Sequence, residues 1–404
     1  MGERKLKPGW RWVKFGQIAE CVNDRVDDPS SAGVERYVGL EHLEPEHLSI
    51  RSWGSPDEVG STKLRFRSGD IIFGKRRAYQ RKLAVADFEG ICSAHAMVLR
   101  PKPETVLAEF LPFFMRSEVF MQRAIEISVG SLSPTINWKT LVRQEFALPG
   151  VAEQSRVLRL LNAIEAAWKA ADFVAGSARI AFHSTVEHLY QAALGCQSSK
   201  PLVNLMNSDR PITYGILMPG TGHPGGVPVV KVKDFPTGEI NESDLLLTSP
   251  DIANAYKRSA LRADDILVSI RGTIGRIAVV PASLEDANIT QDTARLSFHR
   301  DINPTFARAM LTSASMQRAM HSNIPPPAPA GQPPAKAKPR PTIQGLNIGQ
   351  LRKVNMPVPA RPIQDEFAEV ADLARKAMSD SEVRADQMRQ LRQDAIHAAL
   401  EGGA

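Results

Sequence analysis

The stretch GDIIFGKRRAYQR, residues 69–81, decides the architecture because it returns as DDILVSIRGTIGR at residues 264–276. The two stretches lie 195 positions apart and share an aspartate, an aliphatic run and two arginines at the same offsets. At the same separation, residues 121–124 (MQRA) recur unchanged at 316–319. Self-similarity at a fixed separation is the signature of a duplicated fold. We therefore expect two similar domains in tandem.

Farther along, the separation between the two copies grows from 195 to 210, so fifteen residues entered the second copy. The residues that match at the larger separation are Asn137, Leu141, Pro149 and Gln154 with Asn347, Leu351, Pro359 and Gln364. The insertion is visible at 325–341, which holds eight prolines. This composition predicts an extended or disordered loop. Its basic residues Lys336, Lys338 and Arg340 either contact a nucleic-acid backbone or are simply solvated.

The last part of each copy is predicted to form a long helix, because apolar residues recur there at alternating spacings of four and three. At ~1.5 Å per residue, a forty-residue helix is roughly 60 Å long and exceeds what one small domain can bury. We therefore expect the two helices to pair antiparallel, although each could instead fold onto its own domain. The expected seam contains Val157, Leu161, Ile164, Trp168, Ala171, Ala175, Ala178, Phe182 and Leu189, and in the second copy Phe367, Val370, Ala374, Ala377, Met388, Leu391, Ala395 and Ala398.

Together these patterns predict an α+β protein with pseudo-twofold duplication, in which two tandem α/β domains are separated by two long antiparallel coiled-coil helices. Within the domains, we expect strands at 69–73 and 265–270 and helices at 107–125 and 304–320. The predicted boundaries are 1–150 for the first domain, 151–198 for the first long helix, 199–358 for the second domain with its Pro-rich loop at 325–341, and 359–404 for the second long helix.

The composition favours a cytoplasmic, soluble protein. Lys and Arg number 50 against 44 Asp and Glu, a mild basic excess that permits nucleic-acid binding without requiring it. Only three cysteines occur, without metal-ligand spacing, which argues for a reducing compartment and against a zinc site. No stretch approaches the ~18 consecutive apolar residues of a membrane helix.

The ordered, duplicated set of motifs resembles the specificity subunit of type I restriction-modification systems. The residues that carry the resemblance are Gly69-Asp70-Ile71, Thr135-Ile136-Asn137, Pro149 and Glu153-Gln154, and in the second copy Asp265-Ile266, Arg271 to Arg276, Asn347 and Pro359. The second copy departs from the pattern in its Pro-rich insertion and in having Gln364-Asp365-Glu366 where the first copy has Glu153-Gln154.

This resemblance implies one copy of the chain per complex, bound to double-stranded DNA, to two methyltransferase subunits and, with them, to restriction (motor-nuclease) subunits. Each domain would read one half of a bipartite DNA site, and the helices would set the gap between the halves. The methyl donor, ATP and magnesium would belong to the partners, so we expect this chain to have no cofactor, metal site or catalytic residues. The alternative is a coiled-coil DNA-binding scaffold or regulator unconnected with restriction.

Residues 63–82 contain eight basic side chains and one acid, which is the strongest electrostatic footprint in the chain. Domains that read different half-sites should share their phosphate contacts and differ at their base contacts. We therefore assign the shared pairs Arg76/Arg271 and Arg81/Arg276 to phosphates or to hydrogen bonds within the fold, and seek base contacts among unshared residues. The expected DNA-binding residues are Lys75, Arg76, Arg77, Arg81, Lys82, Lys231, Lys233, Arg271 and Arg276, each of which could also be ordinary solvated charge.

Other conspicuous residues have structural interpretations. The glycines at 220–226 lack phosphate-loop spacing and predict a turn that enters a strand. Asn137 and Asn347 are expected to cap helices, because each precedes an apolar periodic stretch. No known catalytic motif, such as HExxH, GxSxG or an amino-methyltransferase motif, occurs.

Overall fold

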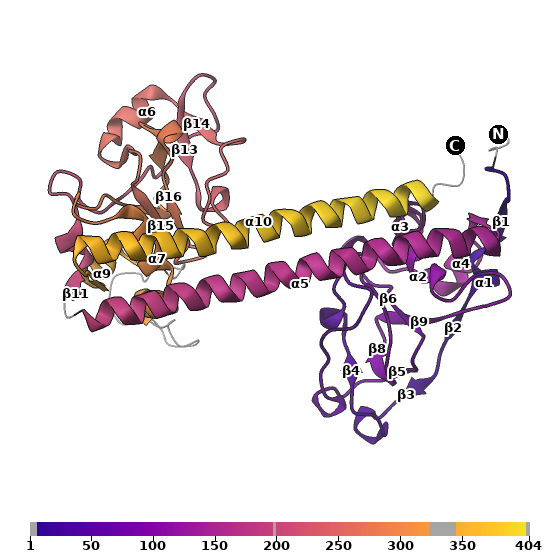
Figure 1. Ribbon diagram of the computed structural model, residues 1–404. Helices are drawn as coiled ribbons and strands as arrows, with labels where there is room; N and C mark the ends of the chain where they lie inside the picture. Colours follow the sequence, from indigo (N-terminus) through magenta and orange to yellow (C-terminus); the bar gives the residue numbers. More distant parts are fainter. Residues whose placement is uncertain (1–5, 197–198, 323–344, 401–404) are drawn as a thin grey trace, which may run out of the picture. The chain divides into compact units, whose positions relative to one another are not determined.

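The computed structural model describes residues 6–196, 199–322 and 345–400. The chain forms two compact units: unit 1 comprises residues 1–172 and 384–404, and unit 2 comprises residues 173–383. Both boundaries fall inside the two long helices, α5 (Val151–Gly195) and α10 (Arg361–Leu400). Each unit therefore contains one half of each long helix (Figure 1). The Pro-rich stretch 325–341 lies outside the described residues.

Unit 1 contains two four-stranded sheets and a two-stranded ribbon. The proximal sheet has the order β2 (Ala19–Val22), β9 (Ala96–Pro101), β6 (Ile71–Gly74) and β7 (Leu83–Val85). The distal sheet, which lies farther from α5 in Figure 1, has the order β3 (Arg25–Val26), β5 (Lys63–Phe66), β8 (Gly90–Ser93) and β4 (Tyr37–Val38). The ribbon pairs β1 (Trp10–Lys14) with β10 (Glu145–Pro149).

Unit 2 repeats this topology. Its proximal sheet has the order β12 (Thr213–Tyr214), β18 (Thr293–Leu296), β15 (Ile266–Ser269) and β16 (Ile277–Val279). Its distal sheet has the order β14 (Leu246–Thr248), β13 (Val227–Val230) and β17 (Asn288–Ile289), and its ribbon pairs β11 (Ser199–Pro201) with β19 (Asn355–Pro357). Each distal sheet contains one parallel pair, β4 with β8 and β13 with β17. The predicted duplication is therefore confirmed in the proximal sheets, the ribbons and the parallel pairs, whereas the distal sheets differ in their remaining strands.

The short helices also correspond, but the two expected domain helices are each broken in two. The first becomes α2 (Phe110–Arg116) and α3 (Glu118–Glu126), and the second becomes α7 (Pro304–Thr312) and α8 (Ala314–Ser322). The break falls at Ser117 and Ser313, which have extended backbones. Each buried serine hydroxyl donates to a carbonyl of the preceding helix and accepts an amide of the next, at 3.4 Å and 3.2 Å. Local capping thus overrides the continuous apolar pattern.

The break also fixes the register of the repeat. Because α3 and α8 both begin directly after the capping serine, equivalent positions there are 196 residues apart rather than 195. The identical MQRA segments at 121–124 and 316–319 are therefore one residue out of structural register. One residue entered the second copy between the strand motif and these helices.

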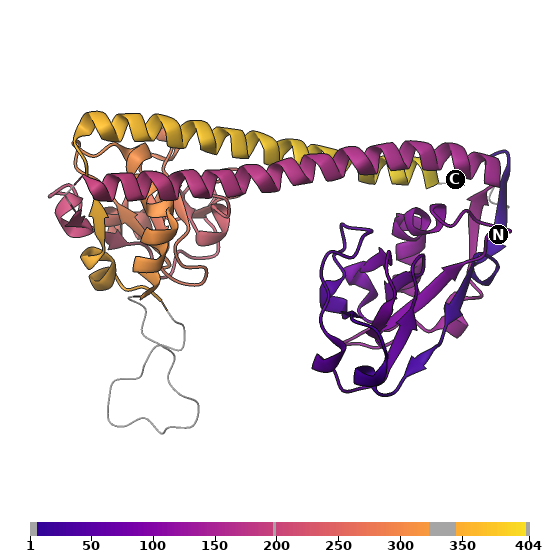
Figure 2. The same ribbon diagram turned by 60° about the horizontal axis from the view of Figure 1, so that its bottom comes forward.

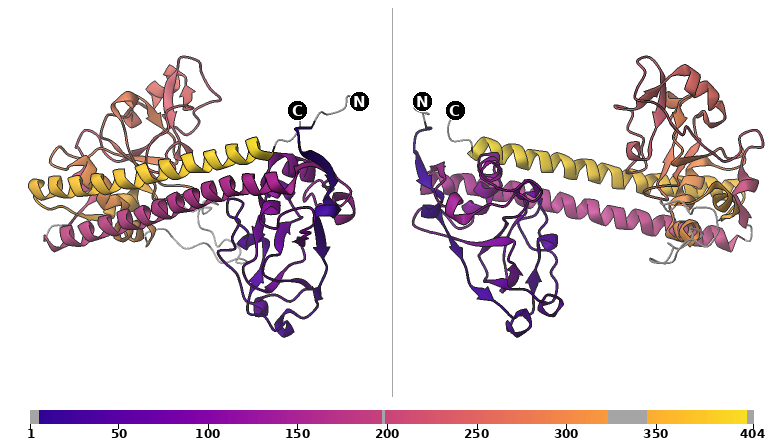
Figure 3. Two further views of the ribbon diagram at one scale, coloured as in Figure 1. Left: turned by 45° about the vertical axis from the view of Figure 1, so that its right-hand side comes forward. Right: turned by 180° about the vertical axis from the view of Figure 1, so that it is seen from behind.

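The long helices pack against each other antiparallel within both units (Figure 2, Figure 3). In unit 1 Arg392 of α10 lies 3.6 Å from Glu165 of α5, and in unit 2 Arg179 of α5 donates to Glu382 of α10 at 2.6 Å. On α5 the predicted seam is buried at Leu161, Trp168, Ala175 and Phe182, which is the heptad spacing expected.

On α10 the predicted seam is confirmed in part, since Phe367, Ala374 and Ala395 pack partly buried against the cores, but at two places the buried residue is the one that follows. The expected seam residues Val370 and Leu391 are 44% and 49% exposed, whereas the residues that follow them, Ala371 and Arg392, are buried. Ala368, Ala385, Ile396 and Leu400 complete the buried stripe. Hydrophobic spacing alone favoured Leu391 because an arginine is an unexpected seam residue, yet Arg392 finds an aromatic ring and two carboxylates there.

Alternate residues of each proximal sheet serve two cores, as the two-residue period of a strand dictates. In unit 1 Ile71 and Phe73 pack toward the helices, and Ile72 packs toward the distal sheet. In unit 2 Ile266 and Val268 pack toward the helices, and Leu267 toward the distal sheet. These strands are buried on both faces, which explains their uninterrupted aliphatic runs.

A buried glutamine fastens each long helix to its unit. Gln154 accepts a hydrogen bond from the Leu107 amide and donates to the Pro149 carbonyl, both at 2.9 Å. Gln364 makes the same two bonds, to the Asn303 amide and the Pro359 carbonyl, at the same distances. The proline and glutamine that match between the copies are therefore a structural attachment.

Candidate nucleic-acid interface

The aspartate of each strand motif is structural. Asp70 is buried, accepts a bond from the amide three residues before it, and pairs with Arg100 through both carboxylate oxygens, at 2.8 and 2.9 Å. Asp265 also accepts the amide three residues before it, at 2.8 Å, and pairs with Arg210 at 2.6 Å. Both carboxylates are therefore occupied in closing the turn that starts the strand. Gly69 and its counterpart Asp264 share the left-handed backbone of that turn.

The end of β6 is joined to the segment before α4 (Trp138–Leu141). Arg76 forms an antiparallel bridge with Thr135, and the amide of Ile136 donates to the carbonyl of Lys75 at 2.9 Å. Asn137 then caps α4 by accepting the Lys139 amide at 2.9 Å. The basic residues and the Thr-Ile-Asn motif, 60 positions apart in the chain, therefore form one backbone unit.

The end of β15 is joined to the chain before α9 (Ile348–Lys353) in the same way. Arg271 bridges Gly345, and the amide of Leu346 donates to the carbonyl of Ile270 at 2.9 Å. Asn347 caps α9 by accepting the Gln350 amide at 2.9 Å. Both asparagines therefore have the capping role predicted for them, and Arg76 and Arg271 occupy equivalent backbone positions.

Arg76 is held with its charge unneutralised. Its Nε donates to the Ser133 hydroxyl at 2.8 Å, and its Nη1 lies 3.3 Å from His95 Nε2. Burial lowers the pKa of His95, and Arg76, Lys75 and Lys63 lower it further, so the local potential is positive. Ser133 and His95 escaped sequence reasoning because neither recurs in the second copy and neither is basic at pH 7.

Arg77 is exposed and has a left-handed backbone, with φ of 57°. Its amide donates to the Pro134 carbonyl at 2.7 Å, which fixes the backbone while leaving the guanidinium directed to solvent. In unit 2 Arg271 is half-exposed, donates to Gln291 Oε1 at 2.9 Å and lies 3.8 Å from the Asp292 carboxylate. The first strand end therefore carries more free positive charge than the second.

Other predicted DNA-binding residues are engaged within the fold. Arg81 makes a two-point ion pair with Glu118, and Lys82 donates to the Leu40 carbonyl at 2.6 Å. Lys63 and Arg65, part of the same basic stretch, donate to the Ser61 and Ala32 carbonyls. The two ends of the basic stretch are therefore engaged within the fold, and its inner residues 75–77 keep their charge available to a ligand.

The predicted basic residues of unit 2 are similarly divided. Lys233 pairs with Asp234 at 2.8 Å, and Lys231 is half-buried beside the same aspartate, which accepts its amide. Arg276 donates to the Val232 carbonyl at 3.1 Å, which satisfies a hydrogen bond without neutralising its charge. The glycine-containing turn before these residues leads into β13, as expected.

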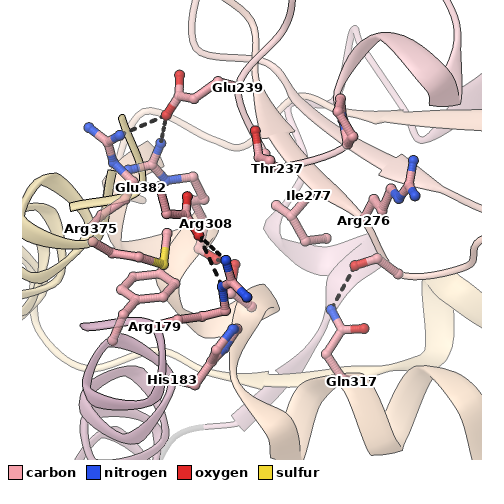
Figure 4. Close-up of a pocket in the computed structure, with 16 residues that line it drawn as sticks. Arg179, His183, Thr237, Glu239, Arg276, Ile277, Arg308, Gln317, Arg375 and Glu382 are labelled. Atoms are coloured by element: carbon pink, nitrogen blue, oxygen red, sulfur yellow. Dashed lines mark hydrogen bonds and ion pairs between the residues drawn. The ribbon is translucent and has the colours of Figure 1, made fainter. Parts of the chain in front are cut away.

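Arg276 also lines a pocket of about 530 Å³ in unit 2. Across this pocket Arg308 and Arg375 reach Glu239, at 3.8 and 2.7 Å, and Arg179 pairs with Glu382 (Figure 4). Three of the four arginines in this pocket therefore pair with its two glutamates and hold the fold together, while Arg276 keeps its charge.

A cavity of about 750 Å³ in unit 1 lies beside the Thr-Ile-Asn segment. Lys75 and Lys139 are among its lining residues, and the lining contains no carboxylate. Sequence reasoning missed this cavity, because its walls come from β2, β5, β9, α4 and the chain just after β6. Among the described residues, no group of three or more His, Cys, Asp or Glu could hold a metal ion, and no helix is long and apolar enough to cross a membrane.

Comparison with known proteins finds sequence similarity for part of the chain and a similar fold for nearly all of it. Residues 57–170 match the model of the type I restriction modification DNA specificity domain. The specificity subunit of the type I restriction enzyme EcoBI from Escherichia coli is 33% identical over 167 residues, which cover 41% of this chain and 32% of that protein. The match thus spans about a third of the length of that relative.

Two solved structures share the fold over nearly the whole chain. One is the S subunit of a type I restriction-modification system from M. genitalium, with a TM-score of 0.56 and 13% identity, covering 98% of both chains. The other comes from a study of complex assembly and conformational transition in a type I R-M system, with a TM-score of 0.54 and 18% identity, covering 98% of this chain and 99% of that one. The matched domain contains the β6 strand end and the Thr-Ile-Asn segment, so residues 57–170 are similar in sequence to the type I restriction modification DNA specificity domain, and the chain shares the fold of the M. genitalium S subunit.

Proposed function

We propose that this chain is the DNA-recognition subunit of a type I restriction-modification complex and performs no catalysis itself. Residues 1–150 and 199–358 would each read one half of a bipartite site, while the helices 151–198 and 359–404 would set the gap between the halves. The observation that carries this proposal is the duplicated backbone unit, in which a cationic strand end is bonded to the segment before a short helix. Such a unit supplies phosphate contacts at the same place in both domains.

We also propose that the chain acts in the cytoplasm of the host. There it would form a complex with two methyltransferase subunits, which restriction subunits join. Two similarities support this. One is the sequence similarity to the specificity subunit of a type I restriction enzyme, and the other is the structural similarity to a chain studied for complex assembly in a type I R-M system. The methyl donor, ATP and magnesium would be bound by those partners.

A comparison of host DNA methylation with and without this chain tests the function directly. We expect one bipartite motif to lose its methylation when the chain is removed, while other methylated motifs are unchanged. Co-purification should yield one copy of this chain with two of the methyltransferase. An unchanged methylation pattern, together with a homodimer that ignores the methyltransferase, would favour a coiled-coil scaffold or regulator instead.

The shared arginines provide a test of the site. Arg76→Ala or Arg271→Ala should weaken binding of the chain–methyltransferase complex to specific and scrambled duplexes alike, and should lower the salt dependence by about one unit of slope, because one phosphate contact is lost. Titrations at several salt concentrations measure both quantities. Arg156→Ala, at an exposed residue of α5 paired with Glu153, is the matched control and should change neither.

Arg77→Ala sharpens that test, because Arg77 is exposed and unshared. We expect it to relax the preference at one base pair by about 1–3 kcal/mol, the value of an arginine contact to a base edge. Discrimination that is lost with Arg76→Ala but retained with Arg77→Ala would reverse the two assignments.

A further inference from the structure

A closed hairpin in unit 1 presents two apolar side chains to solvent. Val129 and Thr135 exchange both backbone hydrogen bonds at 3.0 Å, and Gly130 supplies the positive φ of 120° that the turn needs. Leu132, in the loop of this hairpin, is 92% exposed and Val129 is 78% exposed. Because the hairpin is bonded at its base, these side chains are held out by the backbone.

The base of the hairpin is attached to the cationic end of β6. The Arg77 amide donates to Pro134, the Arg76 guanidinium donates to Ser133, and Thr135 bridges Arg76. Val129 and Thr135 also line the 750 Å³ cavity together with Lys75 and Lys139. The apolar tip and four cations therefore share one support.

We propose that Leu132 and Val129 enter a groove of duplex DNA and pack against the bases, while Lys75, Arg76, Arg77 and Lys139 hold the neighbouring phosphates. This inference rests on the proposed function and adds to it a wedge that helps to determine specificity. The charge of this region indicates DNA as the ligand. The four cations lie near the hairpin, and the lining of the adjoining cavity has no carboxylate, which makes the region complementary to phosphates. Apolar side chains set among Arg and Lys are the means by which proteins unstack base steps and bend a duplex.

The proposal concerns the hairpin of unit 1. The corresponding place in the second copy falls in the Pro-rich stretch 325–341 and its flanks, outside the described residues. Unstacking by this hairpin is therefore confined to the half-site that unit 1 reads.

The test uses the full chain with its methyltransferase and a duplex that carries the motif found in the methylation comparison. 2-Aminopurine placed at successive positions should brighten at one step of one half-site on binding. Leu132→Ser, alone and with Val129→Ser, should abolish that signal and weaken binding about tenfold without changing the salt slope, since no phosphate contact is removed. Leu373→Ser, at a similarly exposed residue of α10, is the control and should change neither.

Three outcomes overturn the inference. If the wild-type complex binds specifically without brightening and the variants bind as tightly, the wedge is wrong and the proposed function stands. If the variants bind DNA normally but lose the methyltransferase, the hairpin docks a protein. If the wild-type complex shows no specific binding at all, both the proposed function and the wedge fail.

Discussion

In each unit a glutamate from the chain between two strands of the distal sheet pairs with an arginine of α10, but the two arginines differ in burial. In unit 1 Glu46 pairs with Arg392 of α10, which is 1% exposed. In unit 2 Glu239 pairs with Arg375 of α10, which is 26% exposed, and is itself 61% exposed (Figure 4). The arginine of the pair is therefore buried in unit 1 and partly exposed in unit 2, while Glu46 itself is 41% exposed.

Burial changes what the pair contributes. The Arg392 guanidinium lies 3.7 Å from the centre of the Trp168 ring and 3.6 Å from Glu165, whose buried oxygens accept no hydrogen bond from the described residues. Burial, with the neighbouring charge of Arg392, lowers the pKa of Arg116 beside this cluster to about 10. Charges taken out of water are costly unless they are paired, so unit 1 depends on its cluster being complete. The solvated pairs of unit 2 are individually worth little.

The sharpest way to break this comparison is to remove the α10 arginine from each unit. Arg392→Met should cost about 3–5 kcal/mol, because it leaves Glu165 buried without its closest cation. Arg375→Met should cost about 0–1 kcal/mol, because its partner Glu239 is solvated. The free energy of unfolding in urea measures both, with tryptophan fluorescence reporting on unit 1, which contains all five tryptophans, and far-ultraviolet circular dichroism reporting on both units.

A double replacement separates lost pairing from lost packing. Arg392→Met combined with Glu165→Leu should recover most of the loss, since an apolar substitute for a buried ion pair is often neutral. Equal losses for Arg392→Met and Arg375→Met would show that the burial difference has no energetic weight.

The glutamine attachments should behave alike where the arginines differ. Gln154→Leu and Gln364→Leu should each cost about 1–3 kcal/mol, because each leaves a buried amide and carbonyl unpaired. The loss should be slightly larger for Gln154, which also donates to the Thr105 carbonyl at 3.3 Å. Urea unfolding at a single pH is sufficient. A large loss of stability at only one of the two glutamines would mean that equal hydrogen-bond geometry does not give equal stabilisation.

The smallest expected effect is on the pH dependence of unit 1. Burial lowers the pKa of His47, as do Arg51 and Arg392, although Glu44 and Asp172 oppose them. A histidine whose pKa is depressed in the folded state takes up a proton on unfolding. Its contribution to the free energy of unfolding is therefore fully present above about pH 6.5 and is lost as the pH falls. His47→Gln should flatten the decline in unfolding free energy between pH 7.5 and 5.5. An unchanged decline would assign it to other groups.

The sequence determined the duplication, the two long helices and the capping asparagines. Repetition at a constant separation survives without knowledge of any contact, and an Asn before an apolar periodic stretch caps locally. The structure places the shared arginines Arg76 and Arg271 at equivalent strand ends.

Only the tertiary structure decided which charged side chains are paired within the fold. Arg81 and Arg76 look alike in the sequence, yet Glu118, 37 residues away, neutralises the first while Ser133 leaves the second charged. The seam of α10 was displaced to Arg392 for the same reason, since the ring of Trp168 and the carboxylates of Glu46 and Glu165 come from distant parts of the chain. The spacing of apolar residues in the sequence predicts which of them are buried. The burial of a charged side chain depends instead on partners that only the folded chain brings together.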